Sequence, residues 1–229
     1  MVRDTDYKHI HDKKRYKFFC FSNIIPIAAS IMNGDVCTLI ISSPNAKFIS
    51  VLYDKIMESN PLIKIGNMQF RLCFLKIFSL KLPENHQFTI TTGTPIIIRL
   101  PEQKYKEHGI MPKINYKYLY WRKEYPIDLF LSQIWINLLK KYFEYHNREY
   151  NHNNSISSFN LFSKLTFKKQ ISTKIFMKDR EHIVIGSIWD FHFKQITNPE
   201  IVQFALDVGL GERNSLGFGF LNIKTTKTV

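Results

Sequence analysis

The sequence predicts an α+β fold in two halves, and the order of its apolar segments is the basis for this prediction. In the second half, residues 86–229, segments with strand or helix periodicity follow the order strand, helix, strand, strand, helix, strand. This is the ferredoxin-like βαββαβ order. The first half, residues 1–85, shows only strand, strand, helix, strand. We therefore expect tandem ferredoxin-like halves, the first of which lacks its opening strand and helix.

The elements of the first half are predicted from periodicity and turn residues. Strands are expected at 17–24 and 36–42, and Asn33-Gly34 between them is a strong turn signal. Pro44-Asn45 opens a helix over 46–58, which has one apolar face. A long, bent strand over 67–80 is expected to complete this half.

The missing opening strand has a structural consequence. In a ferredoxin-like sheet the strands lie side by side in the order fourth, first, third, second, so the missing strand is an inner one. The first sheet therefore cannot close in the usual way. A late start of the sequence, or loss of the element, is favoured over a rearranged half, and a second chain that fills the space remains an alternative.

The second half begins with apolar alternation from Gln87, which is interrupted at Gly93-Thr94-Pro95 by a bulge or break. A basic, tyrosine-rich connection over 101–125 leads to a helix over 126–146. The Asn- and Ser-rich stretch 147–158 is expected to be an exposed loop, and strands are expected at about 159–170 and 182–194. Asn198-Pro199-Glu200 then starts the last helix with a capping side chain and a proline in the first turn.

The chain is strongly basic. It contains 32 Lys and Arg against 19 Asp and Glu, for a formal net charge of +13. Such a surplus favours a polyanionic partner, with nucleic acid first and an anionic membrane surface second. A generally basic proteome is the alternative explanation. Most of the 19 Phe and 11 Tyr belong in the core, and exposed ones could stack on unpaired bases.

The cysteine pattern indicates neither a zinc site nor a disulfide framework. Cys20, Cys37 and Cys73 are odd in number and form no C-x-x-C pair, so buried, reduced thiols are expected. His9 and His11 are a weak candidate metal pair, because no nearby carboxylate–histidine pattern completes it. The N-terminus is too polar for a signal peptide and no apolar run is long enough to span a membrane. We expect a soluble cytoplasmic protein without metal or cofactor.

A glycine-rich segment near the C-terminus is the strongest local signal in the chain. Gly209 and Gly211, then Gly217 and Gly219, form two G-x-G pairs separated by five residues. Paired glycines around polar residues suggest a loop shaped for a ligand, although a long glycine-rich turn is also compatible. The loop leaves a helix and enters a strand, whereas dinucleotide fingerprints follow a strand and open a helix. No Gly-Lys-Ser/Thr closes it, so it is not a P-loop.

This segment resembles the C-terminal signature of the repeat-associated RNA-binding (RAMP) superfamily, most closely its CRISPR-RNA-processing endoribonucleases. In that signature a terminal helix ends in G-h-G-x5-G-h-G, where h is apolar, and a closing strand follows. The four glycines fill the glycine positions, and Leu210 and Phe218 are the apolar residues. The resemblance implies a tandem ferredoxin-like fold and CRISPR repeat RNA as partner. The implied RNA-binding residues are Gly209, Gly211, Arg213, Asn214, Ser215, Gly217, Gly219, Lys14, Arg15, Lys168 and Lys169.

The resemblance also suggests a catalytic site near the N-terminus. In the family, a histidine lies shortly before a strand of the type Lys-x-Phe-Thr-Phe-Ser, which places His11 at the catalytic histidine and Lys17 at its supporting lysine. Cys20 departs from the usual threonine. In many members a tyrosine on the first helix completes the site, but that helix is absent here, and Tyr7 or Tyr16 could replace it only by speculation. Without the resemblance, His11 would be read as a solvated residue.

These residue types suit metal-independent RNA cleavage. The RNA's own 2′-hydroxyl attacks the adjacent phosphorus, which leaves a 2′,3′-cyclic phosphate and a 5′-hydroxyl. A histidine serves as base or acid because its unperturbed pKa is about 6.5. A lysine stabilises the charge that develops on the phosphate.

Other functions remain open on the sequence alone. A binding module of the same fold could hold repeat RNA without cutting it, or act as a subunit of an effector complex, and the missing opening elements favour this alternative. The lysine-rich stretch that includes Lys168 and Lys169 could be a solvated face or could line the RNA. The incomplete first half makes a homodimer plausible. A membrane-surface protein is disfavoured, because the pattern shows no amphipathic anchor.

Overall fold

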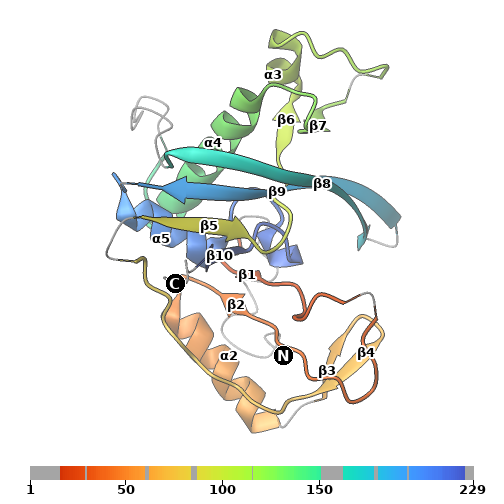
Figure 1. The fold of residues 1–229 in the computed structure, drawn as a ribbon, viewed down its shortest axis with the longest axis vertical. Helices are drawn as coiled ribbons and strands as arrows, with labels where there is room; N and C mark the ends of the chain where they lie inside the picture. Colours follow the sequence, from red (N-terminus) through yellow and green to blue (C-terminus); the bar gives the residue numbers. More distant parts are fainter. Residues whose placement is uncertain are drawn as a thin grey trace.

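A four-stranded antiparallel sheet with two helices on one face forms the centre of the molecule (Figure 1). The computed structural model describes residues 16–28, 30–59, 62–83, 87–114, 116–150, 162–177, 180–194 and 196–224. The sheet contains β5 (Phe88–Thr92), β8 (Lys164–Met177), β9 (Arg180–Phe193) and β10 (Leu221–Lys224). Their spatial order is β10-β5-β9-β8, so within this half the fourth strand neighbours the first, and the third lies between the first and the second. The expected strand order of the second half is therefore observed.

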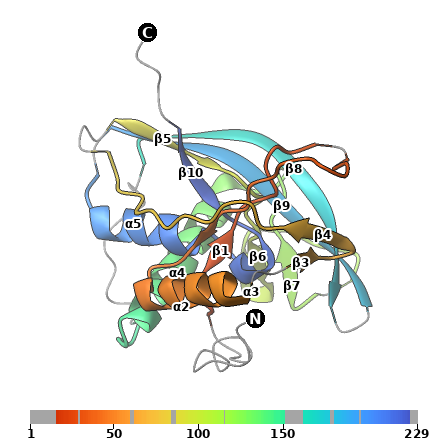
Figure 2. The same ribbon diagram turned by 90° about the horizontal axis from the view of Figure 1, so that it is seen from below.

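Two helices cover the same face of this sheet. They are α4 (Ile127–Tyr145), which precedes β8, and α5 (Pro199–Val208), which precedes β10 (Figure 2). The helix predicted over 126–146 is thus confirmed. The last helix does begin at Pro199, but the Asn198 side chain makes no capping hydrogen bond, so that part of the prediction is wrong. The Asn198 carbonyl accepts the first helical hydrogen bond from Val202 instead.

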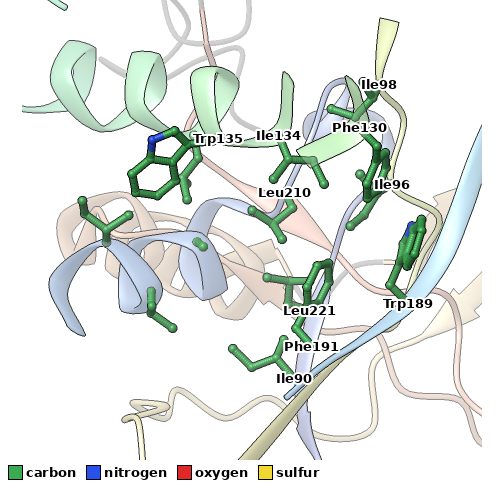
Figure 3. Packing of buried hydrophobic residues seen from close by; sticks show 14 of the residues in the cluster. Ile90, Ile96, Ile98, Phe130, Ile134, Trp135, Trp189, Phe191, Leu210 and Leu221 are labelled. Carbon is green, nitrogen blue, oxygen red and sulfur yellow. The ribbon is translucent and has the colours of Figure 1, made fainter. Parts of the chain in front are cut away.

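The core lies between the sheet and these helices (Figure 3). Along β9 the alternate residues Trp189, Phe191 and Phe193 are buried toward the helices, as the period-two pattern predicts. The Phe130 ring of α4 stacks on Trp189 with centroids 4.6 Å apart. This layer of aromatic and branched side chains joins all of the sheet's central strands to α4 and α5.

A small excursion separates β5 from α4. It contains β6 (Arg99–Pro101), α3 (Glu102–Glu107) and β7 (Tyr118–Tyr120), and β6 pairs with β7 as a separate two-stranded sheet. The prediction treated 101–125 as a connection and missed these elements. The predicted break at 93–95 is present, because β5 ends at Thr92 and Ile96 resumes pairing with Ser187 of β9.

The first half contains β1 (Cys20–Phe21), β2 (Ile41–Ser42), α2 (Ala46–Ser59), β3 (Leu62–Ile65) and β4 (Met68–Arg71). The helix at 46–58 is confirmed, and its Asn45 cap accepts a hydrogen bond from the Phe48 amide. Of the strands predicted at 17–24 and 36–42, only β1 in the middle of the first and β2 at the end of the second are regular strand. They pair antiparallel, and an isolated bridge joins Ile25 to Thr38.

The strand predicted over 67–80 is confirmed only for β4, and its predicted continuation beyond Arg71 is wrong. A hairpin turns at Gly66-Asn67 between β3 and β4, and the chain from residue 72 to residue 83 then runs without a paired strand. Most side chains of the hairpin are exposed, so no buried face imposes the alternation on which the prediction relied.

Candidate functional site

The glycine-rich loop, residues 209–219, closes on itself. All four of its glycines have positive φ, with values of 78°, 71°, 84° and 71° for Gly209, Gly211, Gly217 and Gly219. The Leu210 amide donates to the Gly219 carbonyl at 2.9 Å, so the two G-x-G pairs lie side by side. A Cβ added at Gly219 would overlap the Leu210 carbonyl. The motif is therefore a requirement of backbone geometry at this position.

Two side chains hold the interior of the loop. Asn214 donates from Nδ2 to the carbonyls of Leu210 at 3.0 Å and Phe218 at 2.9 Å. Its Oδ1 accepts from Lys141 Nζ at 2.7 Å, and Lys141 also donates to the carbonyls of Gly209 and Gly211. Asn214 is buried and its polar groups are used within the protein, so it shapes the loop.

Sequence reasoning missed Lys141. A signal was present, because the residue lies three and seven positions after Leu138 and Ile134 and so falls on the buried face of α4. A lysine within an apolar stripe requires acceptors inside the protein.

Glu212 and Arg213 connect the loop to neighbouring strands. Glu212 forms an ion pair with Arg99 of β6 and also accepts from the Arg99 amide at 3.1 Å. Arg213 donates from Nη1 to Met177 Sδ of β8 at 3.0 Å. Its backbone is left-handed, with φ of 60°, and its buried Nε has no hydrogen-bond partner among the described residues. A non-glycine residue in this conformation, with an unsatisfied donor, is a candidate ligand-binding residue.

The strand that follows Lys17 packs directly on the loop. The Phe21 ring covers Gly217, where an added Cβ would lie 2.7 Å from a ring carbon. Ser42 of the neighbouring β2 donates to the Asp207 carbonyl near the end of α5 at 3.0 Å. Cys20 is buried beside Ser42, and its burial raises the pKa of the thiol to about 11. The thiol is therefore neutral at physiological pH.

Lys17 lies between two anchored aromatic residues. Phe18 packs edge-on against Tyr145 of α4 at 5.2 Å, and its backbone has a φ of 46°, which is unusual for a bulky residue. Burial raises the pKa of Tyr16, and the negative charges of Glu144 and Glu212 raise it further. Tyr16 thus lies within electrostatic reach of the glycine-rich loop. The structure brings Lys17 and this loop to the same region of the molecule.

The remaining predicted site residues divide into two groups. His11, Lys14 and Arg15 lie outside the described residues, as does Tyr7. Lys168 and Lys169 are exposed on β8, where Lys168 forms an ion pair with Asp190 at 2.9 Å. Neither lysine donates a hydrogen bond to the glycine-rich loop within the described structure. They belong to the sheet's surface.

Other features agree only in part with expectation. Cys20 is buried as predicted, whereas Cys37 is half-buried and Cys73 is exposed, so the expectation of buried thiols is wrong for Cys73.

In the part of the chain that the structure describes, no cluster of three or more His, Cys, Asp or Glu side chains could bind a metal ion. Within the same residues, no helix has the length and apolar character needed to cross a bilayer.

Comparison with known proteins identifies the family. The model of "CRISPR associated protein Cas6, C-terminal" matches residues 79–223, which is more than half of the chain. A Cas6 endoribonuclease of Methanocaldococcus jannaschii is 32% identical over 97% of this chain and 87% of its own length. A Cas6 endoribonuclease of Haloferax mediterranei is 27% identical over 93% of this chain and 79% of its own length.

Solved structures share the fold. A CRISPR-associated Cas6 protein superposes with a TM-score of 0.64 at 20% identity, over 98% of this chain and 87% of the other. A Cas6-related protein of Pyrococcus furiosus gives 0.63 at 22% identity, over 92% and 79%. A Cas6 product complex gives 0.60 at 14% identity, over 95% and 86%. Together, the sequence matches show that this chain belongs to the Cas6 family of CRISPR-associated proteins.

Proposed function

We propose that this chain is an endoribonuclease that cuts CRISPR repeat RNA into guide RNAs. Its curated relatives are named CRISPR-associated endoribonucleases, and one similar solved structure is described as a RAMP protein that binds different RNA substrates. The observation that carries the proposal is the packing of the Lys17 segment against the glycine-rich loop. The same proposal includes two ferredoxin-like halves with a boundary near residue 85.

The glycine-rich loop is proposed to hold the RNA backbone. Arg213 supplies the positive charge of the loop. Its backbone is left-handed, and its Nε has no hydrogen-bond partner among the described residues. Ser215 is half-buried in the short helix η1 (Asn214–Leu216) and can supply a hydroxyl. Lys168 and Lys169 extend the basic surface along β8, where phosphate contacts would add affinity rather than sequence selection.

Cleavage is proposed to proceed by attack of the 2′-hydroxyl without a metal ion. His11 would remove the hydroxyl proton or protonate the 5′-oxygen, and Lys17 would neutralise the charge on the phosphate. The phenol of Tyr16 is protonated at neutral pH, since burial raises its pKa above an ordinary value that is already high. It is therefore available as a hydrogen-bond donor beside Lys17. The products would carry a 2′,3′-cyclic phosphate and a 5′-hydroxyl.

A cleavage assay tests this proposal. Labelled repeat RNA is incubated in EDTA with the wild type, with His11→Ala, and with His9→Ala as the neighbouring control. We expect His11→Ala to slow cleavage by roughly 10²–10⁴-fold, the usual contribution of proton transfer, and His9→Ala to have little effect. A 2′-deoxy nucleotide at the cleavage position should abolish cutting by the wild type. Cutting that survives His11→Ala would remove His11 from the site.

A non-catalytic RNA-binding protein, alone or within an effector complex, is the second candidate. The thin packing of the first half, where the described core contains few side chains, favours it, because the catalytic segment belongs to that half. Tight binding of repeat RNA with no cleavage under any condition would establish this alternative and exclude the enzyme.

A further inference from the structure

Lys141 is a buried charge that the proposed chemistry does not use. Its side chain is only 3% exposed, and it projects from the core face of α4 toward the end of α5. Burying an ammonium group is unfavourable unless hydrogen bonds replace its hydration. A hydrophobic residue at this position would fill the same space without that cost, so the charge requires an explanation.

The acceptors around Lys141 match the donors of an ammonium group in number. Nζ lies 3.0 Å from the Gly209 carbonyl, 2.7 Å from the Gly211 carbonyl and 2.7 Å from Asn214 Oδ1. A protonated lysine has three N–H donors, whereas the neutral amine has two. Only the charged form can therefore satisfy all of these acceptors at once.

These contacts link Lys141 to both G-x-G pairs of the glycine-rich loop. The Gly209 and Gly211 carbonyls lie just beyond the C-terminus of α5, where a positive charge is favourable. Through Asn214, Lys141 is linked to the carbonyls of Leu210 and Phe218, one in each G-x-G pair. Arg213 sits between these fixed points with a strained backbone. Loss of the central cation would release the restraints on both sides of Arg213.

We propose that Lys141 is a positioning residue for RNA binding, whose ammonium group holds the glycine-rich loop in the conformation that presents Arg213 and Ser215 to the RNA backbone. This inference rests on the proposed function of the loop. It assigns Lys141 no contact with RNA, because the residue is buried and, among the described residues, its Nζ donates only to groups of the loop.

The proposal implies a pH dependence. Burial lowers the pKa of Lys141 to about 7, and the negative charge of Glu212 opposes this effect without overcoming it. Glu212 is itself paired with Arg99, and the nearby Cys20 is a neutral thiol because burial raises its pKa. Asp207 of α5 lies near Cys20, and its negative charge helps to raise the pKa of the thiol. As the pH rises through about 7, the amine loses one donor and the loop loses one of its restraints.

RNA affinity measured by fluorescence anisotropy tests the inference. The probe is repeat RNA with a 2′-deoxy nucleotide at the cleavage position, at pH 6 and pH 8.5. The proteins are the wild type, Lys141→Met, Lys141→Arg and, as a matched control, Lys140→Met, which removes an exposed charge one position away on the same helix.

We expect the affinity of the wild type to fall about tenfold between these pH values, which corresponds to one buried hydrogen bond. Lys141→Met should bind RNA weakly at both pH values. Lys141→Arg stays charged, so its affinity should not decrease between pH 6 and pH 8.5. Lys140→Met should show the same decrease in affinity as the wild type. A folded Lys141→Met protein with wild-type affinity and pH profile would overturn the inference.

A second measurement needs no variant. In wild-type protein labelled with ¹⁵N-glycine, the amide signals of the loop glycines should titrate with a midpoint near 7 in the absence of RNA. Unchanged signals across this range would overturn the inference even if the variants fail to fold. If the wild type binds no repeat RNA, the proposed function fails, and the glycine signals still report whether Lys141 holds the loop.

Discussion

The two halves of the molecule differ in how they bury their hydrophobic side chains. The main core cluster consists of buried residues from Phe88 to Leu221, all in the second half. In the first half, the described buried hydrophobic residues are Cys20, Phe48 and Ile56. This half also contributes thirteen of the twenty-two exposed large hydrophobic residues of the described chain. The second half therefore has its own core, whereas few described side chains of the first half are buried.

Those contacts are concentrated at the candidate site. Phe18 packs on Tyr145, Phe21 covers Gly217, and Ser42 bonds to the carbonyl of Asp207. The segment that carries Lys17 is thus packed against α4, α5 and the glycine-rich loop. We therefore predict that the first half becomes structured only when it packs on the second half.

The largest expected effect is on cooperative unfolding when the two halves are produced as separate fragments. A fragment of residues 86–229 should fold and unfold cooperatively, because it contains the whole main core, whereas a fragment of residues 1–85 should not. Circular dichroism with urea denaturation measures both, with the full chain as reference. A cooperative transition in the N-terminal fragment would show that the first half has a core of its own.

Matched core truncations should sharpen the difference. Phe130→Ala removes a fully buried ring that stacks on Trp189, and we expect a loss of about 3–5 kcal/mol in the free energy of unfolding. Phe48→Ala removes a ring that stacks on Phe19 in the first half, where few buried side chains surround it. We expect a smaller loss, at or below the lower end of that range, because the site can collapse more completely. Chemical denaturation gives both values. Equal losses would contradict the comparison.

Glycine substitutions provide the next test. Gly219→Ala combines a positive φ of 71° with overlap of the Leu210 carbonyl, so we expect a loss of at least about 2 kcal/mol and weaker RNA binding. Gly34→Ala in the first half has a φ of 97° but open space around it, and should cost only about 1 kcal/mol. Thermal unfolding and RNA binding of the two variants are compared. Similar losses in both would indicate that the loop can relax.

The smallest effect concerns the pH dependence of stability. Because burial lowers the pKa of Lys141 to about 7, the unfolded chain binds a proton that the folded protein lacks between this pH and about 10.5. The free energy of unfolding should therefore rise with pH in this interval, by about 1 kcal/mol between pH 7 and pH 8. Stability would rise while RNA affinity falls. The free energy of unfolding is measured against pH for the wild type and for Lys141→Met, and the difference between the two isolates the contribution of Lys141. A difference that does not change with pH would contradict the prediction.

Much of the second half could be predicted, because its strands and helices are long and bury one face. Trp189, Phe191 and Phe193 alternate along β9, and this alternation survives in the core. The hairpin of β3 and β4 was missed because Leu62 and Met68 are exposed and leave no burial pattern. The residues after Arg71 were assigned to a strand although they find no partner strand in the described structure.

The sequence by itself determined the family, the order of the four main strands and two helices of the second half, and the glycine-rich loop. The loop could be predicted because backbone geometry admits only glycine where a Cβ would meet a carbonyl. Tertiary structure alone decided that Lys141 sits beneath that loop and that Phe21 covers it. These contacts join residues 68 or more positions apart, as in the bond from Lys141 to Gly209. Local periodicity carries no information about such pairs, because they depend on how helices and strands pack together in space.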